Sequence, residues 1–114
     1  MTSVYKILSR AEWSAAEASG VFLGAAIDLR DGYIHLSTAA QAAETARLHF
    51  AGRDDLVLVR LSAERLGEAL RWEPSRGGDL FPHIYAPLSC ALAEAVTPID
   101  LGPDGAPALG ELVP

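Results

Sequence analysis

Two short segments of this chain place a histidine beside other groups that could do chemistry. One is Tyr33-Ile34-His35-Leu36-Ser37-Thr38, and the other is Phe81-Pro82-His83-Ile84-Tyr85. An imidazole can donate and accept hydrogen bonds and can transfer a proton near neutral pH. His35 and His83 are therefore candidate catalytic residues. The alternative for each is a structural histidine that bonds to a nearby backbone carbonyl.

The first segment has the alternation of a half-buried strand. Period two places Tyr33, His35 and Ser37 on one face and turns Ile34 and Leu36 toward the core. We expect His35 and Ser37 to face a cleft and to contact a ligand there. Ser37 has a second interpretation as a helix N-cap, because a hydroxyl between a strand and a helix usually fills that position.

The second segment follows a stretch that is suited to phosphate. Ser75 and Arg76 stand before two glycines in residues 73–79, so a hydroxyl, a guanidinium and a flexible backbone occur together. The alternative is a polar connection in which the glycines only turn the chain. Tyr85 could stack on a base or a nicotinamide ring, although aromatic residues in a chain of this size are more often core.

Capping and periodicity predict the elements that position these segments. Two pairs have capping-box spacing and predict helices that end at Gly20 and near Gly52. The pairs are Ser9 with Glu12 and Thr38 with Gln41. We expect strands at residues 4–8, 33–36, 56–61, 70–73 and 91–99, an extended segment at 21–29 and a loop at 74–82. Residues 1–101 are expected to form one domain, followed by a Gly/Pro-rich, poorly ordered tail at 102–114.

The composition excludes several classes of protein. Cys90 is the one cysteine among 114 residues, which excludes an internal disulfide and fits the cytoplasm. No segment is apolar over the length needed to span a membrane. The formal net charge of −6 disfavours nucleic acid as a partner, because phosphate backbones attract positive surfaces. We expect a small nucleotide-type ligand, and the oligomeric state stays open.

A metal site is chemically possible but lacks a sequence motif. His35, His83 and an acid such as Glu73 or Asp79 would suit zinc or iron, which bind two imidazoles and a carboxylate. The two histidines lie far apart in the sequence, without the short spacing of a ligand pair. We therefore expect no metal.

Several blocks of the chain match the motifs of one family. They include Tyr5-Lys6-Ile7, Asp31-Gly32-Tyr33-Ile34-His35-Leu36-Ser37, Trp72-Glu73-Pro74-Ser75-Arg76-Gly77-Gly78 and Phe81-Pro82-His83-Ile84-Tyr85. From about Val4 to Pro98 the chain resembles the small bacterial domain-of-unknown-function family DUF952. That family is similar to the ADP-ribosyltransferase superfamily, with its nearest relatives among the RNA 2′-phosphotransferases. In those enzymes a strand reading Val-His-Leu-Ser occupies the place of Ile34-His35-Leu36-Ser37.

The resemblance implies an α+β fold of two small packed sheets with short flanking helices, and an NAD pocket between the sheets. The residues implied to bind NAD as cofactor are His35, Ser37, Ser75, Arg76 and Tyr85. ADP-ribosyl transfer or NAD cleavage is the implied activity, with His35 and His83 as catalytic residues. The phosphotransferases have an arginine where this chain has Pro74, and the catalytic acid of the transferases has no clear counterpart. The alternative is a non-catalytic binding or regulatory module that kept the pocket.

Overall fold

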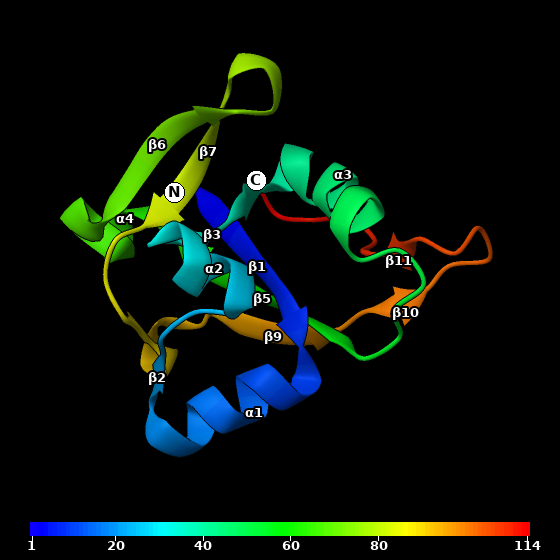
Figure 1. Ribbon diagram of the computed structural model, residues 1–114, viewed down its shortest axis with the longest axis horizontal. Helices are drawn as coiled ribbons and strands as arrows, with labels where there is room; N and C mark the ends of the chain where they lie inside the picture. Colours follow the sequence, from blue (N-terminus) through cyan, green and yellow to red (C-terminus); the bar gives the residue numbers. More distant parts are fainter.

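The computed structural model describes residues 1–114, apart from the side chain of Arg76, and has an α+β fold. Small antiparallel sheets form its body, flanked in the described chain by four short α-helices (Figure 1). The helices are α1 (Arg10–Ser19), α2 (Ala26–Asp31), α3 (Ala39–His49) and α4 (Ala63–Leu66). The strands are β1 (Ser3–Ser9), β2 (Val21–Phe22), β3 (Ile34–His35), β4 (Ser37–Thr38), β5 (Leu56–Ser62), β6 (Leu70–Ser75), β7 (Asp79–Ile84), β8 (Leu88–Ser89), β9 (Ala95–Pro98), β10 (Asp100–Leu101) and β11 (Pro107–Ala108). None of the described helices has both the length and the apolar character needed to cross a membrane.

The largest sheet has the strand order β4-β1-β5-β9. Its strand β5 is the predicted apolar run, and Leu56, Val59 and Leu61 have no exposed surface. Neighbouring residues of β1 face opposite sides of this sheet, so that Leu8 packs into one apolar cluster and Ile7 into another. The strand expected at residues 56–61 is therefore confirmed, and it lies between β1 and β9 with apolar clusters on both faces of the sheet.

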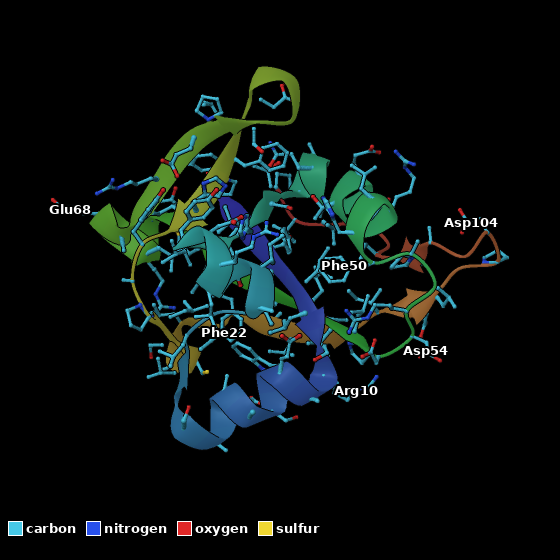
Figure 2. The ribbon with its side chains drawn as sticks, in the orientation of Figure 1. Arg10, Phe22, Phe50, Asp54, Glu68 and Asp104 are labelled. Carbon is cyan, nitrogen blue, oxygen red and sulfur yellow. The ribbon has the colours of Figure 1, made fainter. Side chains whose placement is uncertain are left out.

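The two clusters are covered by different helices. The first contains Trp13 and Ala16 of α1, and the second contains Ala46 of α3. Four of the labelled side chains are charged and lie at the rim of the molecule, whereas the ring of Phe22 lies inside (Figure 2). The labelled rim residues are Arg10, Asp54, Glu68 and Asp104.

Residues 102–114 pack against the domain and do not form the loose tail that their composition suggested. β11 pairs with β10, and Leu109 and Leu112 contact the second apolar cluster. The Tyr5 hydroxyl donates a hydrogen bond to the carbonyl oxygen of Val113 at 2.6 Å. Apolar residues between the glycines and prolines therefore hold this segment against β1.

The prediction of an extended segment at residues 21–29 is wrong beyond Phe22. Residues 26–31 form α2, which ends at Gly32 in the left-handed conformation with φ 88°. Ala25 occupies the N-cap position, so no Ser or Thr side chain caps the helix. Instead the Asp28 carboxylate accepts the backbone N–H of Ala25 at 2.8 Å. An Asp at the third helical position supplies only half of a capping box, so the usual start signal is missing.

The predicted loop at residues 74–82 is mostly a β-hairpin. β6 and β7 pair from Leu70 opposite Ile84 to Ser75 opposite Asp79, and a turn at residues 76–78 joins them. Figure 1 shows this hairpin projecting from the body of the molecule. Pro74 is tolerated because β6 is the edge strand of the sheet β3-β7-β6. The two prolines and two glycines obscured the strand pattern.

The α+β class is confirmed, whereas the number of sheets differs from the expected two. The described chain contains a four-stranded and a three-stranded sheet, together with the two-stranded ladders β2-β8 and β10-β11. These ladders have two residue pairs each, too few to leave a periodic signal in the sequence.

Candidate functional site

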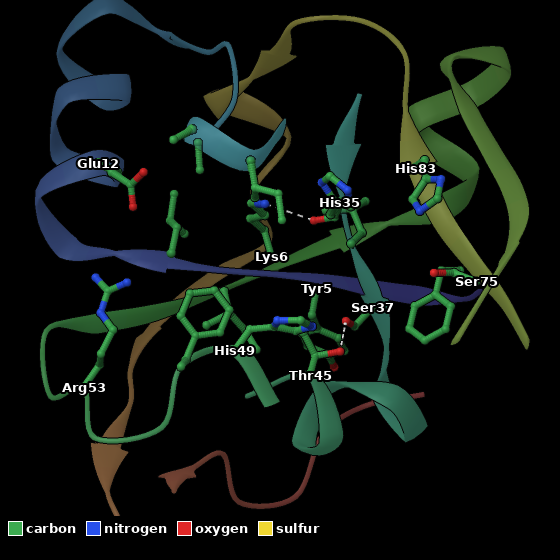
Figure 3. A pocket seen from close by; sticks show the side chains of 18 residues that line it. Tyr5, Lys6, Glu12, His35, Ser37, Thr45, His49, Arg53, Ser75 and His83 are labelled. Carbon is green, nitrogen blue, oxygen red and sulfur yellow. Dashed lines mark hydrogen bonds between the residues drawn. The ribbon is translucent and has the colours of Figure 1, made fainter. Parts of the chain in front are cut away.

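A cleft of about 400 Å³ opens between β1, the β3 and β4 segment, the end of α3 and β7 (Figure 3). Its apolar wall includes Ile7, Leu8, Phe50 and Phe81. The cleft is also lined by four of the side chains predicted from the sequence to form the site, namely His35, Ser37, Ser75 and His83. The structure therefore brings the two histidine segments together at one cleft through these four residues. The side chain of Arg76, the fifth predicted residue, lies outside the described part of the chain.

His35 and His83 lie opposite each other across the pairing of β3 with β7. Their ring centroids are 5.5 Å apart, with the rings almost perpendicular. The flanking residues Ile34 and Leu36 are buried, as the alternation predicted, while the His35 side chain keeps 29% of its surface exposed. The short pairing of two strands therefore brings the two imidazoles together on the cleft wall.

Both ring nitrogens of His35 contact carboxylates. Nδ1 lies 2.6 Å from Oδ1 of Asp28, and Nε2 lies 3.0 Å from Oδ2 of Asp31. Ionised carboxylates only accept hydrogen bonds, so an imidazolium that donates from both nitrogens satisfies both contacts. A neutral ring would satisfy one of them.

Asp28 is held by a buried lysine. The Lys6 ammonium lies 2.8 Å and 3.0 Å from the two carboxylate oxygens of Asp28 and also donates to the backbone carbonyl of His35 at 3.1 Å. These three contacts match the three protons of the ammonium group. Asp28 also accepts the backbone N–H of His35 at 3.0 Å. Lys6 and Asp28 therefore fix both the ring and the backbone of His35.

The ionisation of this buried pair follows from its contacts. Burial alone would raise the pKa of Asp28, but the hydrogen bond from His35 and the Lys6 charge outweigh it and hold that pKa well below its usual range. Burial lowers the pKa of Lys6, and the charge of Asp28 opposes this shift. Asp28 is therefore a carboxylate throughout the neutral range.

The sequence reasoning missed Lys6 and Asp28. Lys6 is the one charged residue in the otherwise apolar stretch 4–8, and buried charges need a partner, so it gave a usable signal. Asp28 gave none, because the helix that carries it was not predicted.

His83 is held by a carboxylate at one ring nitrogen. Nδ1 lies 2.7 Å from Oε1 of Glu73, and the Tyr85 hydroxyl donates to the same oxygen at 2.7 Å. The hydrogen bonds from His83 and Tyr85 lower the pKa of Glu73, while the bond to Glu73 raises the pKa of Tyr85. The His83 side chain is 6% exposed, and the ring of Tyr33 stacks on it at 4.1 Å. Among the described residues, Nε2 of His83 has no hydrogen-bond partner.

Tyr85 is not on the cleft wall. With Tyr33 it borders a second hollow of about 260 Å³, and the guanidinium of Arg71 lies 4.7 Å from its ring centre. Tyr33 separates the two spaces, since its ring also lies 4.6 Å from that of His35 and 5.2 Å from that of Tyr85. The structure therefore does not bring Tyr85 together with the other predicted ligand contacts.

The hydroxyls of Ser37 and Ser75 differ in their surroundings. Ser37 is buried, and its Oγ lies 2.8 Å from the hydroxyl of Thr45 on α3 (Figure 3). Thr38 rather than Ser37 caps α3, in the predicted capping box with Gln41. Ser75 is exposed at the end of β6. The described residues contain no group of three acidic, histidine or cysteine side chains placed to hold a metal ion.

Comparisons with known proteins place this arrangement in one family. The family described as "Protein of unknown function (DUF952)" matches residues 7–96. The chain belongs to the DUF952 family. It is similar to the protein CC0527 from Caulobacter crescentus, whose crystal structure is 55% identical with a TM-score of 0.93 over 96% of both chains. The solution NMR structure of CC0527 has a TM-score of 0.87, at 55% identity, over 96% of this chain and 95% of that one. No curated protein matches this DUF952 chain.

Proposed function

We propose that this DUF952 domain binds a nucleotide-type small molecule, with NAD as the prime candidate, in the cleft that holds the two histidines. The observation that supports this most strongly is the convergence of His35, Ser37, Ser75 and His83 on one wall of that cleft. These side chains come from two distant segments and offer hydrogen bonds beside an apolar surface. That combination suits a ligand with both a ring and a sugar or phosphate.

The size of the cleft suggests how such a ligand would lie. A volume of about 400 Å³ is near the small end of ligand sites, which span roughly 300–1,000 Å³. One nucleotide half of NAD would fill it, and the other half would extend over the rim. Arg53 lines the cleft at the end away from Ser75 and His83 (Figure 3), and its guanidinium reaches solvent and pairs with Asp55 at 2.9 Å. It offers a positive charge to a phosphate at the edge.

The activity that the superfamily resemblance implies is ADP-ribosyl transfer or NAD cleavage. The bond between nicotinamide and ribose would break through an oxocarbenium-like state, and a cleft that orients the ribose would supply much of the rate enhancement. His35 and His83 would contact the reacting sugar. An ADP-ribosyltransferase-like arrangement of the sheets is part of the same proposal.

A non-catalytic binding module is the second candidate, and the role of the one carboxylate on the described cleft wall favours it. Glu12 is the one carboxylate on the described cleft wall, and its side chain accepts the backbone N–H of Ser9 at 3.0 Å as a helix cap. A carboxylate in a capping role is poorly placed to stabilise a sugar cation. Binding without turnover is the outcome that this contact predicts.

Calorimetric titration with NAD, ADP-ribose and nicotinamide mononucleotide tests binding, and chromatographic detection of nicotinamide tests cleavage. Ser75→Ala should weaken binding, whereas Tyr85→Phe, which changes a side chain outside the cleft, should leave it unchanged. Saturation without nicotinamide release would identify the binding module. A wild-type protein that binds none of the three ligands at millimolar concentration would overturn the proposal.

A further inference from the structure

We propose that His35 and His83 act as general acid and general base in the hydrolysis of a nucleoside 2′,3′-cyclic phosphate. This inference rests on the proposed function, because it places a nucleotide in the same cleft. It adds a substrate class and assigns a separate role to each histidine.

The first observation is the matched placement of the two imidazoles. They lie opposite each other on β3 and β7 with ring centroids 5.5 Å apart, and both line the cleft (Figure 3). A carboxylate orients each ring through Nδ1, Asp28 at 2.6 Å and Glu73 at 2.7 Å. Nε2 of His83 is left without a partner among the described residues, whereas Nε2 of His35 contacts the exposed Asp31 carboxylate at 3.0 Å, so Nε2 is the proton-transfer nitrogen of each ring once Asp31 moves aside.

The second observation is that the two rings have different hydrogen-bond partners. His35 faces carboxylates at both nitrogens, which favours the imidazolium and makes its Nε2 a proton donor. His83 donates from Nδ1 to Glu73, and its Nε2 has no partner among the described residues. That nitrogen keeps a lone pair and can accept a proton. This difference in hydrogen-bond geometry assigns the acid role to His35 and the base role to His83.

The third observation concerns the nucleophile. Ser37 Oγ is held by Thr45, and the described hydrogen bonds place no serine hydroxyl against either imidazole. An acid and a base without an activated side-chain nucleophile suit a reaction in which water attacks and an oxygen leaves. Opening a cyclic phosphodiester is such a reaction. Hydroxyls on the wall and Arg53 at the rim provide donors for the phosphate oxygens.

The reaction balances with these two groups. Nε2 of His83 takes a proton from water while the water oxygen bonds to phosphorus. The bond from phosphorus to the ribose 2′ oxygen breaks, and Nε2 of His35 gives its proton to that oxygen, which leaves a nucleoside 3′-phosphate. Asp31 must release Nε2 of His35 for this step. The Asp31 side chain reaches solvent and can move away from the ring. Its carboxylate also accepts a hydrogen bond from Arg30 at 2.9 Å, so its charge stays paired when it leaves His35. Exchange with solvent then restores both histidines.

The negative net charge of the protein favours a free cyclic mononucleotide as substrate over an RNA chain that ends in a cyclic phosphate. The formal net charge of −6 repels a polyanion, whereas a mononucleotide carries one phosphate and fits a cleft of about 400 Å³. The assignment is therefore a cyclic mononucleotide.

The test incubates the full chain with adenosine 2′,3′-cyclic phosphate and separates the adenosine 2′- and 3′-phosphates by chromatography. Wild type should form the 3′-phosphate alone, and His35→Ala and His83→Ala should each lower kcat by about 100-fold or more. Glu68→Ala changes an exposed side chain at the rim of the molecule, outside the cleft, and should leave the rate unchanged. Glu73→Gln should lower kcat about tenfold with little change in KM, as expected for a positioning residue.

Thermal unfolding of each variant separates lost chemistry from lost fold, and His83→Ala tests the pair independently if His35→Ala does not fold. Absence of hydrolysis by a wild-type protein that still binds nucleotides in calorimetry would overturn this inference and leave the proposed function standing. Absence of both binding and hydrolysis would overturn the two together. Faster cleavage of an RNA oligonucleotide ending in a cyclic phosphate would overturn the assigned substrate class.

Discussion

His35 and His83 make the same contact to a carboxylate in two very different surroundings. Asp28, the partner of His35, is 1% exposed, and the buried ammonium of Lys6 balances its charge. Glu73, the partner of His83, lies on an edge strand and shares its oxygen with the Tyr85 hydroxyl. One carboxylate belongs to the core and the other to the surface. Removing each should therefore give effects of different kind, with stability lost at the first and the ring orientation lost at the second.

The largest effect is expected at the buried pair. Lys6→Met leaves the Asp28 carboxylate buried without its ammonium partner, and breaking a buried ion pair in this way costs about 3–5 kcal/mol of unfolding free energy. Urea denaturation measures it. The double variant Lys6→Met/Asp28→Asn removes both charges, keeps an oxygen acceptor for the backbone N–H groups that Asp28 holds, and should recover part of the loss. A single variant as stable as wild type would show that Lys6 does not balance Asp28.

Acid should destabilise the protein through the same carboxylate. The pKa of Asp28 is lower in the folded protein than in the unfolded chain, so its contribution is fully present above the unfolded value near 3.8. That contribution is lost as the pH falls through the folded value. Unfolding free energy measured from pH 6 down to pH 2 should decline more steeply for wild type than for Asp28→Asn. Equal slopes would contradict the assignment.

The two helix caps and the central strand could be predicted from local patterns, because each depends on neighbours in the sequence. Ser9 and Thr38 cap their helices as expected, and the apolar run 56–61 is β5. The side of the strand on which His35 lies could also be predicted, because it depends only on the alternation of residues along the strand. The pairing of His35 with His83 could not be predicted, because strand register depends on contacts distant in sequence.

Lys6 and Asp28 show what local patterns leave out. The role of Lys6 depends on a carboxylate that arrives from α2, and α2 begins without a standard cap. Tyr85 lies at the second hollow and not at the predicted cleft, because the ring of Tyr33 stands between the two spaces. Both facts come from tertiary packing, which the periodicity of one segment cannot report.

A smaller effect than at the buried pair is expected for ligand binding at His35. His35→Ala removes one polar contact to a ligand, which should cost roughly 0.5–1.5 kcal/mol of binding free energy, or about a two- to tenfold weaker Kd. Titration of NAD into wild type and variant measures the change. His49→Ala is the matched control, because it removes an imidazole from the same wall. Equal losses in the two variants would show that the position opposite His83 has no special role.

The smallest effect is expected at the surface carboxylate. Glu73→Gln should leave the midpoint of thermal unfolding unchanged, because Glu73 contacts solvent and its loss leaves no buried charge unpaired. The hydrogen bond to Glu73 raises the pKa of Tyr85, so the substitution should lower that pKa toward its ordinary value. Tyrosinate absorbance at alkaline pH reports the shift, and Tyr85→Phe identifies the signal among the three tyrosines. An unchanged titration would contradict the bond.

The hydrogen bond from Tyr5 to Val113 ties the cleft to the far end of the sequence. Tyr5 lies on the cleft wall and packs with Ile7, while Leu109 and Leu112 cover the same cluster from outside. A protease that trims the last six residues would take away an outer layer of the wall without touching any residue that faces the ligand space. The shape of the cleft in this DUF952 domain therefore depends on an intact C-terminus, and a tag fused there would lie beside the residues that support the cleft wall.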